Sequence, residues 1–394
     1  MSTVQRVLIA GGGIGGLATA VALRRRGVET VVVERAAAFR DVGSGLVLAP
    51  NGMKALAALD ADLAADVRLH GNVFGPDHDS RFMTSSGKTL SRVSFGDVEK
   101  TWGVPVLAIL RSKLHDVMLR HALAAGAEIR GGAEVVGYSD GGDAAAATLA
   151  DGSTVEADLM IGADGVKSAV RRQLLDDGDP EYRGYTAVRG VGKLPASDPH
   201  GFLAYGRGLI LFAAAIGDGR AYWVASLNSA PDVWPRKTPR TAHGDLTELL
   251  AGWHPDLSAM AASADPDECV LTDVVDRDPV GVWHRGRVAL LGDAAHPMTY
   301  TMGQGANTTL QDAVVLAHHL DADGPLDAAL AAYTAERAPQ TAKIVKQSRM
   351  MGNIGQVANP VGAWFRNRMM TLMGRFGDPD KQNAELYGWT PPRL

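Results

Sequence analysis

The chain is poor in cysteine, since Cys269 is the only one among 394 residues. A lone thiol can form neither an intrachain disulfide nor a cysteine-based metal cluster, and it fits a reducing compartment. We interpret Cys269 as a small buried hydrophobic residue rather than a nucleophile, and we predict no metal site. No apolar run reaches the ~18 residues that a membrane span needs. These absences favour a cytoplasmic protein without stable membrane insertion.

A strong charge of one sign is also lacking. The formal net charge is −5, with both signs scattered along the sequence, which argues against nucleic acid as a partner. Apolar residues make up 46% of the chain and charged residues 21%, as in globular proteins with ample material for a core. The length exceeds that of one ordinary core and predicts about two domains.

Glycine, by contrast, is abundant along the chain and forms one dense run near the N-terminus. Residues 11–16 read Gly-Gly-Gly-Ile-Gly-Gly, between an expected buried strand at 7–10 and an expected helix that ends at Gly27. Glycines at the GxGxxG positions permit a tight turn, close approach of the backbone to a pyrophosphate, and close packing of helix on strand. A second expected strand, at 30–34, ends in Glu34, where a carboxylate can accept from ribose hydroxyls. The combination predicts a dinucleotide site and argues against a secretory signal.

The rest of the chain changes pattern twice. Helical periodicity at 111–125, a strand from Val135, a hairpin about Asp151-Gly152 and a buried strand at 159–161 continue an α/β arrangement. From 182 to 272 short strands punctuated by Gly and Asp predict a mostly antiparallel sheet. The buried-strand pattern returns at 287–291, and helices are expected at 303–320 and 326–349.

We therefore predict an α/β (α+β) fold in which a Rossmann-like domain is interrupted by an antiparallel sheet domain and completed by C-terminal helices. The first domain would take residues 1–72, 101–181 and 281–376. The inserted substrate domain would take 73–100 and 182–280, and 377–394 would form a tail.

Three separated motifs resemble one family. They are Gly11–Gly16 with Glu34-Arg35, the string Gly162-Ala163-Asp164-Gly165, and Gly292-Asp293-Ala294-Ala295-His296-Pro297. Together with 42–52, 111–114 and 286–313 they resemble the group A, para-hydroxybenzoate hydroxylase-like FAD-dependent monooxygenases over nearly the whole chain. The resemblance implies FAD, NADPH or NADH as a transient co-substrate, and O₂. It also implies hydroxylation or epoxidation of a small electron-rich aromatic or unsaturated substrate through a flavin C4a-hydroperoxide.

The resemblance assigns cofactor contacts position by position. Glycines 13, 15 and 16 would face the pyrophosphate, and Asp293 would bind the ribityl chain. A helix that begins at 303–307 would place its positive end under the reduced flavin. The implied cofactor residues are Gly13, Gly15, Gly16, Glu34, Arg35, Val47, Arg111, Val135, Asp164, Asp293, Gly303, Gln304, Gly305, Ala306 and Asn307.

Some of these residues have a plainer interpretation. Arg111 alone reads as a solvated arginine in a first helical turn, and Asp164-Gly165 alone reads as a structural turn. His296 is expected to be structural rather than a catalytic base.

The substrate side has no comparable motif. Tyr222 is the candidate for proton transfer or substrate orientation, with Arg189 and Tyr205 behind it, although each also reads as a packed sheet residue. By the resemblance, Tyr300 stands where many relatives have proline, in a loop whose backbone carbonyl would lie near the flavin. Residues 209–215 contain no ionisable group and favour a largely apolar substrate.

Two questions stay open at this stage. Residues 364–373 form either a basic amphipathic helix on a membrane or, as we favour, a helix packed across the flavin domain. Alternative functions are a flavin-dependent reductase of prenyl or polyene substrates and a non-oxygenating, redox-sensing FAD protein. The protein is expected to be a monomer or a homodimer.

Overall fold

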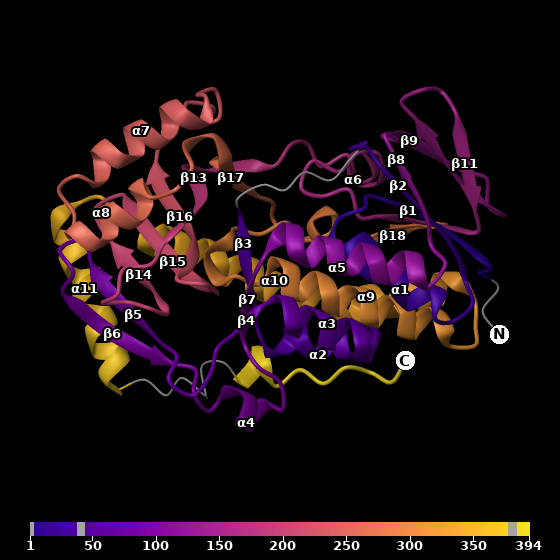
Figure 1. Cartoon of the computed structure of the whole chain (residues 1–394). Helices are drawn as coiled ribbons and strands as arrows, with labels where there is room; N and C mark the ends of the chain where they lie inside the picture. The colour runs from indigo at the N-terminus through magenta and orange to yellow at the C-terminus, as the bar shows by residue number, and fades with distance from the viewer. Residues whose placement is uncertain (1–3, 38–43, 377–383) are drawn as a thin grey trace.

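The computed structural model describes residues 4–37, 44–376 and 384–394 (Figure 1). Its first sheet has six strands in the order β18-β19-β12-β1-β2-β8. The strands are β1 (Arg6–Ala10), β2 (Glu29–Glu34), β8 (Glu128–Gly131), β12 (Leu159–Gly162), β18 (His284–Arg285) and β19 (Val288–Leu290). All neighbours pair in parallel except β18, which is antiparallel at the edge. The Rossmann-like prediction is confirmed.

Helices pack beside this sheet because their apolar sides need burial (Figure 1). Helix α1 (Ile14–Arg24) is buried at every position except Arg24 and packs mainly on α5 (Arg111–Ala124) and α9 (Gly305–Asp321). Beyond α9 lie α2 (Pro50–Leu59), which leads into α3 (Ala61–His70), and the long α10 (Leu326–Gly355).

The second sheet has seven strands in the order β17-β13-β16-β15-β14-β5-β6. Only β5 and β14 pair in parallel. The strands are β5 (Asp79–Thr84), β6 (Thr89–Ser94), β13 (Glu181–Lys193), β14 (Gly201–Tyr205), β15 (Leu209–Gly217), β16 (Arg220–Asn228) and β17 (Val270–Asp276). This confirms the mostly antiparallel layer.

Two helices that the sequence reasoning missed cover one face of this sheet: α7 (Pro239–Leu250) and α8 (Pro255–Ala262). Leu246 and Leu250 of α7 and Met260 of α8 share a core cluster with Trp223 of β16. The sequence does contain helix-start signals here, because Thr238 caps α7 and both helices begin with proline. The strand-like pattern of the surrounding residues outweighed them in the prediction.

Smaller elements join the two sheets. Strands β3 (Gly45–Leu48), β7 (Leu107–Leu110) and β4 (Asn72–Val73) form one three-stranded sheet, in which β3 contacts β16 and β7 contacts β15. Strands β9 (Val135–Asp140), β10 (Ala145–Leu149) and β11 (Thr154–Ala157) form another and confirm the predicted hairpin. Two short helices, α4 (Val98–Trp102) and α6 (Ala169–Leu175), complete the connections.

The last helix lies elsewhere than expected. Helix α11 (Pro360–Phe376) packs on β6 at the edge of the antiparallel sheet (Figure 1), so the expected packing across the flavin domain is wrong. Residues 384–394 return to the other helices, where Lys54 Nζ donates to the Tyr387 carbonyl at 2.7 Å. No helix of the described chain is long and apolar enough to cross a membrane. The domain boundaries stay a prediction.

Candidate flavin site

The three sequence motifs meet at the carboxyl ends of β1, β12 and β19. Ala163 N–H donates to the Ala10 carbonyl at 2.8 Å, and Leu291 N–H donates to the Gly162 carbonyl at 2.9 Å. Gly11 has a φ of +107°, and a Cβ there would lie 2.4 Å from the Ala163 oxygen. Such an edge of a parallel sheet is where α/β folds bind ligands. Position 11 requires glycine, because a side chain there would collide with Ala163 of the second motif.

The N-terminus of α1 has no side-chain cap. Gly13 is its N-cap and makes no side-chain capping bond, whereas Ser168 caps α6. A Cβ on Gly16 would lie 1.9 Å from the Gly11 carbonyl, but one on Gly13 would meet nothing within 4 Å. Gly15 and Gly16 are themselves buried. The first N–H groups thus face open space with no side-chain partner, as an anion site requires.

Glu34 lies beside that turn. Its carboxylate accepts from Gly12 N–H at 2.8 Å and from Ala36 N–H at 2.9 Å. Arg35 is exposed next to it, and Val135 follows the 131–133 turn, where Ala133 N–H donates to the Glu34 carbonyl at 2.8 Å. The residues assigned to the adenosine end are therefore brought together.

His115 was missed by the sequence reasoning. Its Nε2 donates to the Gly12 carbonyl at 2.7 Å and ties α5 to the glycine turn. Only its position, one helical turn after Arg111, could have signalled this role.

Asp164 combines a structural role with a free oxygen. One carboxylate oxygen accepts from Ala169 N–H at 2.8 Å and Val170 N–H at 3.2 Å. The other oxygen is buried and has no hydrogen-bond partner among the described residues. Burial raises the pKa of this carboxyl group, against hydrogen bonds from Ser168 and the backbone. A buried acceptor without a partner is costly and fits a ligand hydroxyl.

Asp293 combines solvent exposure with dense protein surroundings, from which we infer that it lies in a recess. Its side chain is exposed to solvent, yet burial raises its pKa, with His296 and Arg111 acting in the opposite direction. Both statements hold if solvent reaches the carboxylate only through a channel walled by protein. Arg111 is exposed and begins α5, where its N–H donates to the Ser44 carbonyl at 2.9 Å.

The start of α9 faces the same recess. Its N-cap, Gln304, makes no side-chain capping bond, and a Cβ on Gly305 would lie 3.9 Å from the Asp293 carboxylate. Gly303 has a φ of +63° and open space around it. Ala306 is half-buried. Helix α9 therefore directs a second positive helix end at the recess.

Asn307 fixes β3 to this helix. Its side chain accepts from Ala49 N–H at 3.0 Å and donates to the Val47 carbonyl at 3.2 Å. Asn51, a further residue that sequence reasoning did not select, donates to the Gln304 side chain at 3.0 Å. Val47 is thereby held beside the start of α9. Residues 42 and 43 of the same expected loop lie outside the described residues.

A buried ionic network supports the recess from behind. Asp312 accepts from Arg337 Nε at 2.7 Å and from His296 Nε2, and all three side chains are almost completely buried. Burial alone would raise the pKa of Asp312, but His296 and Arg337 outweigh it and hold that pKa below its usual value. Asp312 also accepts from Gly292 N–H at 3.2 Å. His296 is placed as a structural residue that positions the Asp293 turn.

Across the recess, alternate residues of the antiparallel sheet form one face, because side chains of a strand alternate in direction. This substrate-side face is largely apolar, with Ala187, Val191, Phe212, Ala214 and Val224 in one cluster. Tyr222 is buried within it, and a Cβ on Gly45 would lie 2.4 Å from its ring. Burial raises the Tyr222 pKa. Tyr205 lies in a different cluster with Met370 of α11, so it does not stand behind Tyr222.

Tyr300 and Arg189 meet at the border of this face. Tyr300 begins a 3-10 helix, Tyr300–Met302, and its hydroxyl bonds to the Ser226 hydroxyl. The Arg189 guanidinium lies 5.0 Å from the centre of the Tyr300 ring and donates to the Thr272 hydroxyl at 2.5 Å. Burial lowers the Arg189 pKa and raises that of Tyr300. The Tyr300 carbonyl accepts from Gly303 N–H at 2.8 Å, so the loop turns directly into α9.

Comparisons with known proteins agree with this geometry. The family model described as "FAD binding domain" matches residues 5–348. The aurachin C monooxygenase/isomerase of Stigmatella aurantiaca is 36% identical over 95% of both chains. The 3-hydroxybenzoate 6-hydroxylase 1 of Aquipseudomonas alcaligenes is 32% identical over 93% of both chains. A single-residue variant of Klebsiella pneumoniae HpxO, solved with FAD, superposes with a TM-score of 0.87 at 25% identity, covering 98% of this chain and 99% of that one.

The chain belongs to the group A FAD-dependent monooxygenases. It is accordingly an FAD enzyme that takes electrons from NAD(P)H and uses O₂ to hydroxylate or epoxidise an aromatic or unsaturated substrate. The site fits FAD on its own terms, since two uncapped helix starts, an orphaned Asp164 oxygen and the recessed Asp293 surround one space. Among the described residues no cluster of His, Cys, Asp or Glu could hold a metal ion.

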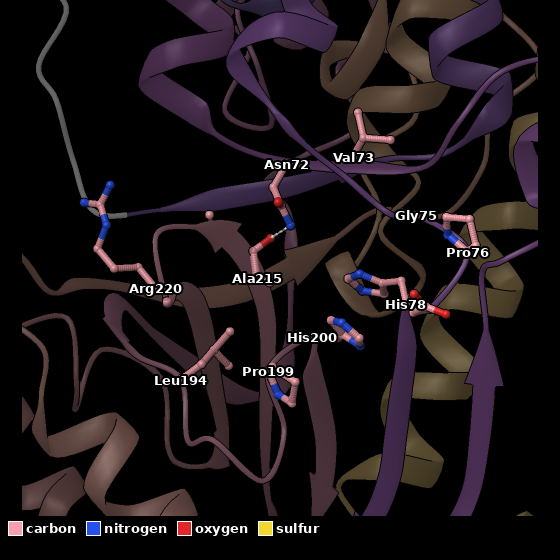
Figure 2. Close-up of a pocket in the computed structure, with 13 residues that line it drawn as sticks. Asn72, Val73, Gly75, Pro76, His78, Leu194, Pro199, His200, Ala215 and Arg220 are labelled. Atoms are coloured by element: carbon pink, nitrogen blue, oxygen red, sulfur yellow. Dashed lines mark hydrogen bonds between the residues drawn. The ribbon is translucent and has the colours of Figure 1, made fainter.

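The monooxygenase also has a cavity of about 280 Å³ at the rim of the antiparallel sheet, near the turn between β15 and β16 (Figure 2). Asn72 lines it and donates to the Ala215 carbonyl at 2.9 Å. His78 and His200 stack at its far side with ring centres 4.6 Å apart. None of the cofactor residues assigned above lines this cavity, so it is separate from the flavin recess.

Proposed function

We propose that this monooxygenase hydroxylates a small aromatic substrate that carries an anionic or phenolic oxygen, and that this oxygen binds Arg189. The ring would lie on the substrate-side face of the antiparallel sheet, between Tyr222 and the flavin. The proposal refines the expectation of a largely apolar substrate by adding one polar anchor.

Arg189 is an arginine without a counter-ion in the described part of the chain. Among the described residues, Arg189 contacts the Tyr300 ring and the Thr272 hydroxyl, but it pairs with no carboxylate. Arg189 is partly exposed and protein surroundings lower its pKa, so a ligand oxygen that accepts two of its N–H groups would supply the missing partner. The apolar residues around it suit the aromatic ring of the same ligand.

One relative supports this substrate class. By its name, the 3-hydroxybenzoate 6-hydroxylase acts on a benzoate that carries both a carboxylate and a phenol. A substrate of that type would offer an anionic oxygen to Arg189 and an electron-rich ring to the activated oxygen.

Tyr222 and Tyr300 would act as hydrogen-bond donors to the substrate. Because burial raises both pKa values, the two phenols stay protonated at neutral pH and do not serve as anionic bases. The Tyr300 hydroxyl already pairs with Ser226, which offers a short path for a proton away from the substrate.

The cofactor would be held by the residues that surround the recess. FAD, reduced by NADPH or NADH, supplies the activation of O₂ when it is bound. The α1 N–H groups behind Gly13, Gly15 and Gly16 would hold the pyrophosphate, and Glu34, Arg35 and Val135 would hold the adenosine. Asp293 and Asp164 would accept from ribityl hydroxyls or neighbouring groups, with Arg111 close to Asp293. The start of α9, at Gly303 to Asn307, and the Val47 backbone would face the isoalloxazine ring.

Substrate-dependent turnover tests the proposal. The FAD-loaded protein is assayed with 3-hydroxybenzoate, with uncharged 3-hydroxybenzyl alcohol and with arenes that carry no hydroxyl or carboxylate. NAD(P)H oxidation, O₂ uptake and product are measured. We expect coupled hydroxylation of the anionic or phenolic compounds and little with the unsubstituted ones. Substrate reduction without O₂ uptake would instead identify the reductase alternative, and no turnover with any phenol or arene would contradict the proposal.

We further propose that the protein is cytoplasmic and works as a monomer or homodimer. The lone cysteine supports a reducing compartment. Retention of the protein inside the cell rather than in the medium, and sedimentation of the purified protein, check the two statements.

A further inference from the structure

Helix α11 buries one side that includes an arginine. Arg366 is 4% exposed, donates to the Gly355 carbonyl at 2.9 Å and the Gly206 carbonyl at 2.7 Å, and lies 4.9 Å from the centre of the Tyr205 ring. Met370 and Ala363 complete the buried side. These contacts fix the rotation of the helix about its axis, so the side that faces solvent is defined.

The solvent side carries large apolar residues at the spacing of one helix face. This apolar stripe consists of Val361, Trp364, Phe365, Met369, Leu372 and Met373, with exposed fractions of 64%, 61%, 63%, 41%, 47% and 51%. A surface helix of a globular protein normally buries such a stripe in the core. A contiguous exposed patch of this kind usually marks an interaction site.

The charged residues of α11 itself are all positive. Between Glu336 and Asp378 the sequence contains Lys and Arg but no Asp or Glu. Arg368 lies within the stripe and is exposed. Arg207 is exposed as well and lines, together with Trp364, a cavity of about 320 Å³ at the start of α11. The protein as a whole is negative, at −5, so this local excess is not a general property of its surface.

We propose that α11 docks the monooxygenase on an anionic lipid bilayer, with the apolar stripe inserted at the level of the headgroups. Tryptophan and phenylalanine favour that depth, and arginine can keep its aliphatic part in lipid while its guanidinium reaches phosphate. Apolar burial and attraction to anionic lipid together bind such helices parallel to the membrane. The proposal does not depend on the substrate assigned to the recess.

A second copy of the chain fits this face less well. In a two-fold contact the same surface meets itself, so an antiparallel pair of stripes centred near residue 367 would bring Arg368 close to its own copy. Arg368 has no carboxylate neighbour within α11 to neutralise it. Anionic headgroups would neutralise it on a bilayer.

Vesicle flotation of the full-length, FAD-loaded protein tests the proposal. We expect binding to vesicles of phosphatidylcholine with 30% phosphatidylglycerol, weaker binding to phosphatidylcholine alone, and release as salt is raised. The double variant Trp364→Ser/Phe365→Ser should lose at least about ten-fold in vesicle affinity, since each ring buries a large apolar surface. Arg368→Glu should weaken binding to the anionic vesicles more than to the neutral ones.

Matched variants keep the test specific. Leu69→Ser in α3 and Leu249→Ser in α7 each replace an exposed apolar residue that lies away from α11; the exposed fractions are 80% and 52%. Both variant proteins should bind vesicles like the wild type. FAD content and NAD(P)H oxidation should be unchanged in the double variant, which separates docking from folding and catalysis. No binding to anionic vesicles at low salt, or equal binding by the double variant, overturns the proposal. The proposal is also overturned if the wild type is a dimer, the double variant is a monomer, and neither protein binds vesicles.

Discussion

Around the parallel sheet, the groups that face the recess are mainly backbone N–H groups, at the starts of α1 and α9. On the antiparallel sheet they are side chains, namely Tyr222, Arg189 and Tyr300. Backbone groups present the same atoms whatever the residue, and only glycine lets them approach a ligand closely. Side chains can be exchanged strand by strand without disturbing the sheet. The first region is therefore suited to a fixed cofactor and the second to a variable substrate.

The largest expected effect comes from the backbone side. Gly16→Ala places a Cβ 1.9 Å from the Gly11 carbonyl, so we expect little soluble protein or complete loss of bound FAD. Gly13→Ala meets no protein atom within 4 Å and should fold normally, yet bind FAD at least about ten-fold more weakly, because its methyl group enters the cofactor space. Soluble yield, circular dichroism and FAD titration measure both variants.

The control for this pair is Gly244→Ala in α7, which also has open space around it. It should leave folding and FAD affinity intact. Equal FAD affinity in Gly13→Ala and the wild type would show that α1 does not face the pyrophosphate.

The second prediction concerns the buried ionic network of Asp312, Arg337 and His296 behind the flavin recess. Asp312→Asn leaves Arg337 and His296 without their buried counter-ion and should cost about 3–5 kcal/mol of unfolding free energy. Because the folded pKa of Asp312 is depressed, its contribution is present above the unfolded value of about 3.8 and is lost as the pH falls through the folded value. Denaturant unfolding at pH 7 measures the cost. Asp278→Asn, at an exposed pair with Arg349, should have a much smaller effect, and equal effects would contradict the assigned role.

The third change removes one proposed ligand of the flavin. The Asp293→Ala variant should fold like the wild type. The Asp293 side chain is exposed, and its loss should remove no hydrogen bond that stabilises the fold among the described residues. FAD affinity should fall about ten-fold or more through the loss of charge-assisted hydrogen bonds. Flavin fluorescence during FAD titration measures this. Unchanged affinity would remove Asp293 from the site.

The smallest effect belongs to the rim of the antiparallel sheet. His78 is 4% exposed, and burial, with His200 adding to it, lowers its pKa from 6.5 to about 4. The unfolded chain therefore binds a proton between these values that the folded chain does not, so stability should fall as the pH drops from about 6.5 to 4. His78→Gln should flatten this part of the stability curve. The exposed His70→Gln serves as its control, and identical curves for the wild type and His78→Gln would contradict the assignment.

The same contrast explains what the sequence could reveal. The parallel strands, α1 and the flavin motifs follow local rules, since Gly11, Gly16 and Glu34 lie within one βαβ unit. The partners of Arg189 depend on how strands pair, because Thr272 and Tyr300 come close to it only after folding. Sequence reasoning also misplaced α11, since helical spacing shows that a helix has an apolar stripe but not which neighbour buries it.

The most direct measurement compares one variant from each side. FAD affinity and the KM for an anionic phenol are determined for Gly13→Ala and for Arg189→Gln, with FAD saturating in the KM assays. We predict that Gly13→Ala weakens FAD binding and leaves KM near the wild-type value, whereas Arg189→Gln keeps FAD affinity and raises KM about ten-fold or more. Loss of FAD affinity in Arg189→Gln, or an unchanged KM, would contradict the division of the site into a backbone cofactor side and a side-chain substrate side.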